Sequence, residues 1–212
     1  AEIGTFAVPS PGKSNEGGKF LTKQTEMPSF SLKPGFYKDA QTIEMSVKDK
    51  NAKIYYTTNG SEPTPQSTPY TEPIIIEKNT PIRAAAFVDG EISSEINTAS
   101  YFIDEREINI PVVALVAEPE LIYGDSFGII ATGVNGNVEI PGYCNDPLEN
   151  TYANYYNDWK HPSNFELFDA NDKEQINLEV KIGVYGSCSR TKRIKSLKVN
   201  ASKIYGGNEF DY

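Results

Sequence analysis

Hydrophobic and polar residues alternate in short runs along most of this chain, and turn residues separate the runs. Residues 42–47 read TIEMSV, and residues 179–185 read EVKIGVY. A two-residue period is typical of strands with one buried face. No segment long enough for an ordinary helix keeps the i, i+3, i+4 spacing of an amphipathic helix with caps. The sequence therefore predicts a mainly β protein.

Residues 30–103 have the densest pattern of this kind. Their strand-like runs recur about every ten residues, which is typical of a β-sandwich. Asn59-Gly60 and Asp89-Gly90 are hairpin-type turn sequences. We expect two small sheets packed face to face, with strands near residues 42–47, 52–58, 74–76, 82–88 and 96–103.

One motif in this region is specific. Residues 54–64 read IYYTTNGSEPT and residues 82–87 read IRAAAF. Together they resemble the immunoglobulin-like domain at the C-terminus of chitobiases and hexosaminidases. The resemblance implies a spacer or binding module without catalytic residues. Tyr55, Tyr56 and Tyr70 are candidates for stacking on sugar rings; the alternative is that they pack in the core.

Residues 1–29 are rich in Gly, Ser, Pro and Lys and predict a linker or the remnant of a preceding domain. Within them, residues 7–15, AVPSPGKSN, resemble the exit of a lamin-tail-like β-domain; the other interpretation is an ordinary flexible linker. Residues 104–107, DERE, predict a short hinge before a second, β-rich domain at 109–212.

In that second domain, residues 110–117 and 127–131 are apolar runs suited to buried strands, and residues 179–185 and 194–199 predict two more strands. The stretch 133–164 has no clear period and contains Trp159, a further candidate for contacting sugar. A segment of that length without regular structure usually carries a function or needs a covalent tie.

A cluster of basic residues interrupts the acidic composition. The chain has a formal net charge of −9, yet residues 190–203 contain no Asp or Glu and hold Arg190, Lys192, Arg193, Lys195, Lys198 and Lys203. An Arg fork and a Lys point charge suit the oxygens of a phosphate, so Arg190 and Lys195 are the candidate phosphate- or nucleotide-binding pair. The alternative is a solvated basic face. We expect no nucleic-acid partner.

The same region resembles a second family. Residues 186–190 (GSCSR), 195–198 (KSLK) and 210–212 (FDY), preceded by 110–115 (IPVVAL) and 159–166 (WKHPSNFE), are similar to the CotH family of spore-coat-related atypical kinases. The resemblance implies ATP and Mg²⁺ as cofactors of a full-length protein. The family's acidic catalytic motifs lie beyond such a segment, so we expect no cofactor and no turnover in this part alone. His161 stands where the family more often has Arg.

The two cysteines, Cys144 and Cys188, permit one disulfide; the alternative is two free thiols. A structural zinc site needs about four ligands, which one histidine and two cysteines do not supply, and the spacing of Asp158, Glu166, Asp169 and Asp172 fits surface charge better than an EF-hand, so we predict no metal site.

The chain has no apolar run long enough for a transmembrane helix, and its first residues lack the features of a signal peptide. We expect an exported protein, extracellular or at the cell surface, whose own signal has been removed, and we expect a monomer. Two functions follow: part of a CotH-like kinase, or a non-catalytic surface protein that binds a glycan or another protein.

Overall fold

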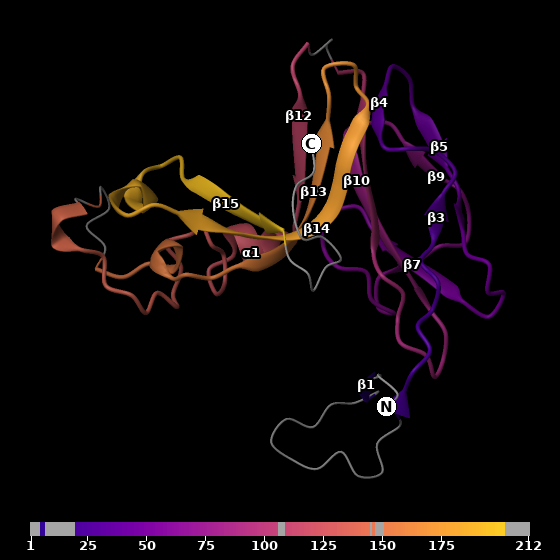
Figure 1. The fold of residues 1–212 in the computed structure, drawn as a ribbon, viewed down its shortest axis with the longest axis horizontal. Coiled ribbons are helices and arrows are strands. Elements are labelled where there is room, and N and C mark those ends of the chain that lie inside the picture. The colour runs from indigo at the N-terminus through magenta and orange to yellow at the C-terminus, as the bar shows by residue number, and fades with distance from the viewer. Residues whose placement is uncertain (1–4, 7–19, 106–108, 145, 147–150, 202–212) are drawn as a thin grey trace. The chain divides into compact units, whose positions relative to one another are not determined.

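The computed structural model describes residues 5–6, 20–105, 109–144, 146 and 151–201 (Figure 1). The chain divides into two compact units, Ala1–Arg106 and Glu107–Tyr212. The division falls within the segment that the sequence indicates as a hinge. Strands dominate both units, as predicted, and the one α-helix of the described residues, α1 (Pro119–Tyr123), is a single short turn.

The first unit contains a five-stranded sheet in the order β4-β11-β10-β7-β8. All neighbours are antiparallel except β4 and β11, which are parallel. The strands are β4 (Gly35–Tyr37), β7 (Lys53–Thr57), β8 (Thr68–Pro69), β10 (Thr80–Phe87) and β11 (Asn97–Ile103). β-branched and aromatic residues are frequent in these strands, as a pleated, half-buried surface favours.

Two strand pairs form the opposing layer: β3 (Ser29–Phe30) with β6 (Met45–Ser46), and β5 (Gln41–Ile43) with β9 (Ile74–Ile76). Ile43 and Met45 from this layer share one hydrophobic cluster with Ile82 and Tyr101 of the large sheet. Ile43, Ile82 and Tyr101 are 0% exposed, so the core lies between the layers. The predicted β-sandwich is confirmed.

The sandwich begins before residue 30. The Thr25 N–H donates to the Ile92 carbonyl, and the Ile92 N–H donates to the Lys23 carbonyl. The Asn97 side chain donates to the carbonyl of Pro28, which is fully buried. The composition predicted a linker for residues 23–29, but they are part of the sandwich. Their apolar content is low, and hydrogen bonds of their backbone to residues 92 and 97 hold them there. A further pair joins β1 (Thr5–Phe6) to β2 (Phe20–Leu21). The lamin-tail-like stretch 7–15 lies outside the described residues.

The second unit is built on an antiparallel sheet whose strands follow chain order: β12 (Val112–Val116), β13 (His161–Phe168), β14 (Glu174–Tyr185) and β15 (Ser196–Ala201). β14 is long enough to pair with β13 from Glu174 to Ile182 and with β15 from Val180 to Tyr185. β12 and β15 therefore lie toward opposite ends of β14 (Figure 1).

The second core lies on the face of β14 that carries Val180, Ile182 and Val184. The segment between β12 and β13 packs on this face and contributes Ile129 and Tyr155 to the cluster. This segment holds α1 and two 3-10 turns, η1 (Gly142–Cys144) and η2 (Asn154–Tyr156).

The predicted strand at 127–131 is wrong. These residues form turns, and their backbone bonds to α1: the Ile129 N–H donates to the Leu121 carbonyl and the Ile130 N–H to the Ile122 carbonyl. An apolar run of this length is equally compatible with a buried irregular segment, and tertiary packing decided the outcome. The last predicted strand, 194–199, is present as β15 but begins at Ser196.

Candidate functional site

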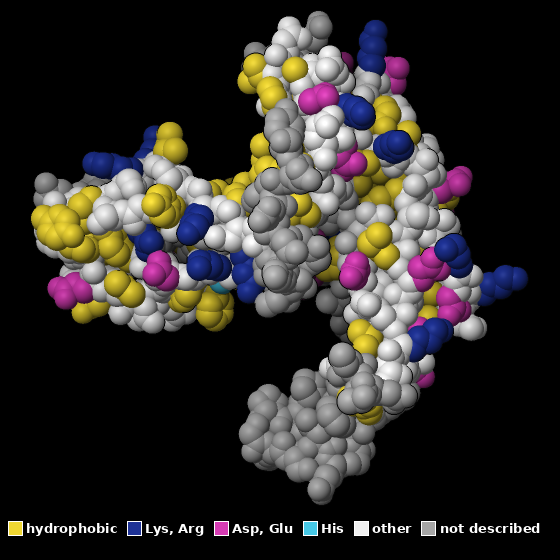
Figure 2. Space-filling view, viewed as in Figure 1, with side chains coloured by type: hydrophobic (Ala, Val, Ile, Leu, Met, Phe, Trp, Pro, Cys, Tyr) yellow, Lys and Arg dark blue, Asp and Glu magenta, His cyan; other side chains and the backbone are white. Residues whose placement is uncertain are grey.

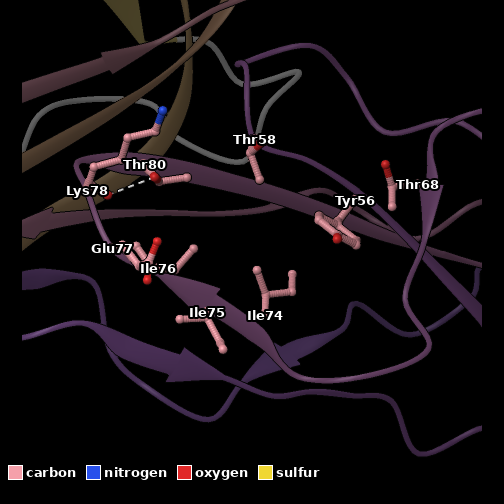
Figure 3. Close-up of a pocket in the computed structure, with 9 residues that line it drawn as sticks. All are labelled: Tyr56, Thr58, Thr68, Ile74, Ile75, Ile76, Glu77, Lys78 and Thr80. Atoms are coloured by element: carbon pink, nitrogen blue, oxygen red, sulfur yellow. Dashed lines mark hydrogen bonds between the residues drawn. The ribbon is translucent and has the colours of Figure 1, made fainter.

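A pocket of about 480 Å³ lies between the two layers of the sandwich, beside β7, β8 and β9 (Figure 3). The large sheet supplies Tyr56 from β7 and Thr68 from β8, and the opposing layer supplies Ile74, Ile75 and Ile76 from β9. The side chains of Thr58 and Ile74 point into the space between β7 and β9 from opposite sides (Figure 3). Glu77, Lys78 and Thr80 complete the lining.

The strand registers explain why Tyr56 faces this pocket. Side chains alternate along β7, so Ile54 and Tyr56 point to the core side and Tyr55 points away. Tyr56 is paired across the strands with Ala84 on one side and Thr68 on the other. Because Ala84 is small and Thr68 lies on the edge strand, the Tyr56 ring is only half-buried.

A buried arginine fixes the turn that follows β7. Arg83 is 1% exposed, and its Nη1 donates to the Gly60 carbonyl at 3.1 Å while its Nε donates to the Thr98 hydroxyl at 3.3 Å. Gly60 has φ of +90°, a conformation that favours glycine. The turn after β7, which begins with Thr58, is thereby held against the sheet.

The three tyrosines that the sequence indicates for sugar contact do not share one site. Tyr56 lines the pocket between the layers, whereas Tyr55 and Tyr70 line a separate hollow of about 330 Å³. Neighbouring residues of a strand point to opposite faces, so Tyr55 and Tyr56 cannot stack on one sugar ring. Tyr56 and Tyr70 also pack against the core cluster, which is the alternative that the sequence left open.

Sequence reasoning missed most of the pocket lining. Thr68, Ile75 and Glu77 lie outside the motif of residues 54–64, and only the packing of the two layers places β9 beside Tyr56. The nearest signal for the pocket in the sequence is the continuous Ile-Ile-Ile run of residues 74–76. In the structure its middle residue, Ile75, is 67% exposed.

In the second unit, Arg190 is held by the protein itself. It lies in the 3-10 turn η3 (Cys188–Thr191), and its Nε donates to the Gly186 carbonyl at 2.6 Å. Its Nη1 donates to the Tyr156 carbonyl at 3.1 Å, and its Nη2 bonds to Asp158 at 3.0 Å. All three nitrogens of the guanidinium are therefore engaged within the protein, and the predicted contact of Arg190 with a phosphate stays a prediction.

Lys195 lines a different hollow, of about 330 Å³, together with Lys192, Arg193 and Tyr155. Its Nζ lies 4.0 Å from the centroid of the Tyr155 ring and donates to the Lys192 carbonyl at 2.9 Å. Burial lowers the pKa of Lys195, while nearby Asp146 partly opposes that shift. Lys and Arg side chains gather over the part of the molecule that carries β15 (Figure 2). Lys203 lies outside the described residues.

Cys144 and Cys188, the predicted pair, are joined by a disulfide with an S–S distance of 2.16 Å. The bridge ties η1 to η3 across 44 residues of sequence. The Tyr156 hydroxyl contacts the Cys144 sulfur at 3.1 Å and the Ser187 carbonyl at 3.1 Å. The turn η3 is therefore fixed both by the disulfide and by the Tyr156 hydroxyl.

Trp159 and His161 have structural neighbours. The Trp159 ring packs against the second core and lies 5.9 Å from the Phe127 ring and 6.2 Å from the His161 ring. The His161 Nε2 lies 2.9 Å from the Phe127 carbonyl, and it donates a hydrogen bond to this carbonyl in the tautomer that carries the hydrogen on Nε2. Trp159 thus helps to cover β14, and its predicted contact with sugar stays a prediction.

Comparison with known proteins identifies the class of the first unit. Residues 32–98 match the family model of the chitobiase/beta-hexosaminidase C-terminal domain. An endoglucanase of Clostridium saccharobutylicum is 44% identical over 55 residues, which is 26% of this chain and 12% of the endoglucanase. The chain therefore spans only a small part of that relative. The first unit is a β-sandwich module of a kind found in carbohydrate-active proteins.

Two further observations concern ions and membranes. Among the described residues, no group of three His, Cys, Asp or Glu side chains is placed to hold a metal ion. No helix in the part of the chain that the structure describes has the length and hydrophobicity needed to span a membrane.

Proposed function

We propose that the first unit is a glycan-binding module of a secreted or cell-surface protein and that the pocket between its layers holds the sugar. The observation that carries the proposal is the pocket of Tyr56, Thr58, Thr68 and Ile74, placed inside the segment that matches a domain of carbohydrate-active proteins. The disulfide of the second unit supports an oxidising compartment, as expected outside the cytosol.

The lining suits the chemistry of a sugar ring. A pyranose presents C–H groups on its faces and hydroxyls around its rim, so it needs an apolar surface beside donors and acceptors. Tyr56 and Ile74 supply the apolar surface, and threonine hydroxyls with Glu77 supply the polar partners. Concave sites that combine apolar walls with a few placed polar groups are typical ligand sites.

Substitutions at Tyr56 and Ile74 test this site. We expect Tyr56→Ala and Ile74→Ala each to weaken binding of cellohexaose or chitohexaose by about 5- to 20-fold, since each removes about 1–2 kcal/mol of apolar contact. Isothermal titration calorimetry on the 212-residue chain measures the change. Ile75→Ala should leave the affinity unchanged, because Ile75 is 67% exposed and its side chain points away from Tyr56 (Figure 3).

Tyr123→Ala is the matched control, because Tyr123 is 69% exposed and belongs to the second unit. It should leave the affinity unchanged. Full affinity in both pocket variants, or an equal loss in Tyr123→Ala, would contradict the assignment of the site.

We propose a second function for the second unit: binding of a phosphate-bearing ligand at the hollow of Lys192, Arg193 and Lys195. Three cations around one cavity favour the binding of an anion. The Lys195 ammonium contributes most of the electrostatic attraction, because it is half-buried and its charge is partly desolvated there. The CotH resemblance suggests ATP with Mg²⁺ in a longer protein, where acidic residues from elsewhere would hold the metal. Arg190 supports the turn and does not contact the ligand.

Lys195→Ala should weaken binding of inorganic pyrophosphate by at least fivefold, whereas Lys198→Ala should change it little. Lys198 lies in β15, 5.9 Å from the Tyr185 ring, and does not line the hollow. Because burial lowers the pKa of Lys195, affinity should fall as pH rises, and at a lower pH than an ordinary lysine would require. Equal losses for both variants would indicate a diffuse basic surface instead of a site.

A further inference from the structure

A second hollow of the first unit lies beside the end of the β7–β8 ribbon and shares no lining residue with the pocket of Figure 3. Its volume is about 330 Å³, and two aromatic rings, Tyr55 and Tyr70, contribute to its wall together with Pro69 and Thr71. The hollow is mainly apolar, but Lys53 stands in its lining.

The two tyrosines are held by the sandwich. Tyr55 lies across from Pro69 on one side and Ala85 on the other, and its ring meets the Phe87 ring edge-on at 5.6 Å. The Tyr70 N–H donates to the Ile54 carbonyl at 2.9 Å, which continues the β7–β8 pairing beyond Pro69. Both rings are half-buried, so part of each remains accessible in a fixed orientation.

The charge of this hollow differs from that of the first pocket. Glu77 and Lys78 offset each other in the first pocket, whereas Lys53 is the only charged residue among the described residues that line the second. Lys53 is exposed and makes no ion pair with a residue in the described part of the chain. Because the chain has a net charge of −9, Lys53 attracts an anion only at short range.

We propose that this second hollow binds an acidic sugar residue, with the carboxylate paired to Lys53 and the C–H face of the ring against Tyr55, which shares one face of β7 with Lys53. The Tyr55 ring requires a ligand with an apolar face, the lysine requires a negative group, and the Thr71 hydroxyl can bond to a sugar hydroxyl. A uronic acid residue satisfies all three. The inference rests on the proposed glycan binding by the first unit and adds a site of different specificity.

The test titrates the ¹⁵N-labelled 212-residue chain separately with trigalacturonate and with cellohexaose. Trigalacturonate should shift the amide signals of Lys53, Tyr55, Tyr70 and Thr71, and cellohexaose should shift those of Tyr56, Thr58 and Ile74. Lys53→Gln should weaken trigalacturonate binding at least fivefold and leave cellohexaose binding unchanged, while Lys53→Arg should retain most of the affinity.

Lys50→Gln is the matched control, because it removes the same charge from an exposed residue that does not line the hollow. Equal effects of Lys50→Gln and Lys53→Gln would overturn the proposal in favour of general electrostatic attraction. Cellohexaose shifts without trigalacturonate shifts would overturn it while the proposed function stands. Binding of trigalacturonate that shifts only the signals of the first pocket would also overturn it.

Discussion

Replacing Arg190 with alanine should lower the free energy of unfolding of the second unit by about 3 kcal/mol, because the carbonyls of Gly186 and Tyr156 lose a charged donor and hydrogen bonds to charged groups contribute about 1.5–3 kcal/mol each. The Arg190 side chain is only 14% exposed. Its ion pair with Asp158 adds little to the free energy of unfolding, because the Asp158 side chain is 87% exposed. Most of the loss therefore comes from the two carbonyls.

Urea unfolding followed by tryptophan fluorescence measures this effect selectively, because the chain has one tryptophan, Trp159, and it lies in the second unit. Arg193→Ala serves as the control, since Arg193 is exposed. It removes the same charge and should leave the midpoint unchanged. A full-stability Arg190→Ala variant that no longer binds pyrophosphate would contradict the structural role and return Arg190 to the ligand site.

Removing the disulfide should have a still larger effect. The bridge closes a loop of 44 residues, and the chain-entropy estimate for such a loop is about 4 kcal/mol. The Cys144→Ala, Cys188→Ala double variant should unfold at a much lower urea concentration when followed by Trp159 fluorescence. The transition of the first unit, which has no cysteine, should stay where it is.

Mass spectrometry of non-reduced peptides provides the independent check on the bridge. Protein purified from an oxidising compartment should yield one peptide pair linked through Cys144 and Cys188. Two alkylatable thiols in that material, together with unchanged stability of the double variant, would contradict the covalent tie between η1 and η3.

The sequence predicted the strands better than the sites. Alternation and the turn residues located β7, β9, β10 and β11 closely, because each of these strands has one face in a core. It failed at residues 127–131, whose backbone pairs with α1 instead of with a strand, while Ile129 packs in the core beside β14. It also failed at residues 23–29, where backbone pairing with Ile92 and other long-range hydrogen bonds hold a polar segment that no periodicity marks.

The sites depended on contacts that are remote in sequence. The basic cluster is visible in the composition, but only the fold shows that Arg190 faces the carbonyls of Tyr156 and Gly186 while Lys195 faces a cavity. Likewise, the alternation of β7 already implies that Tyr55 and Tyr56 diverge. Which of them lines a pocket with Ile74 follows from the packing of the two layers.

The most direct test of glycan binding by the first unit is a crystal structure of the 212-residue chain soaked with cellohexaose or chitohexaose. We predict density for a sugar ring between β7 and β9, in contact with Tyr56 and Ile74 and within hydrogen-bonding distance of Thr58 or Thr68. An empty pocket at saturating oligosaccharide in solution, or sugar bound only to the second unit, would contradict the proposed function.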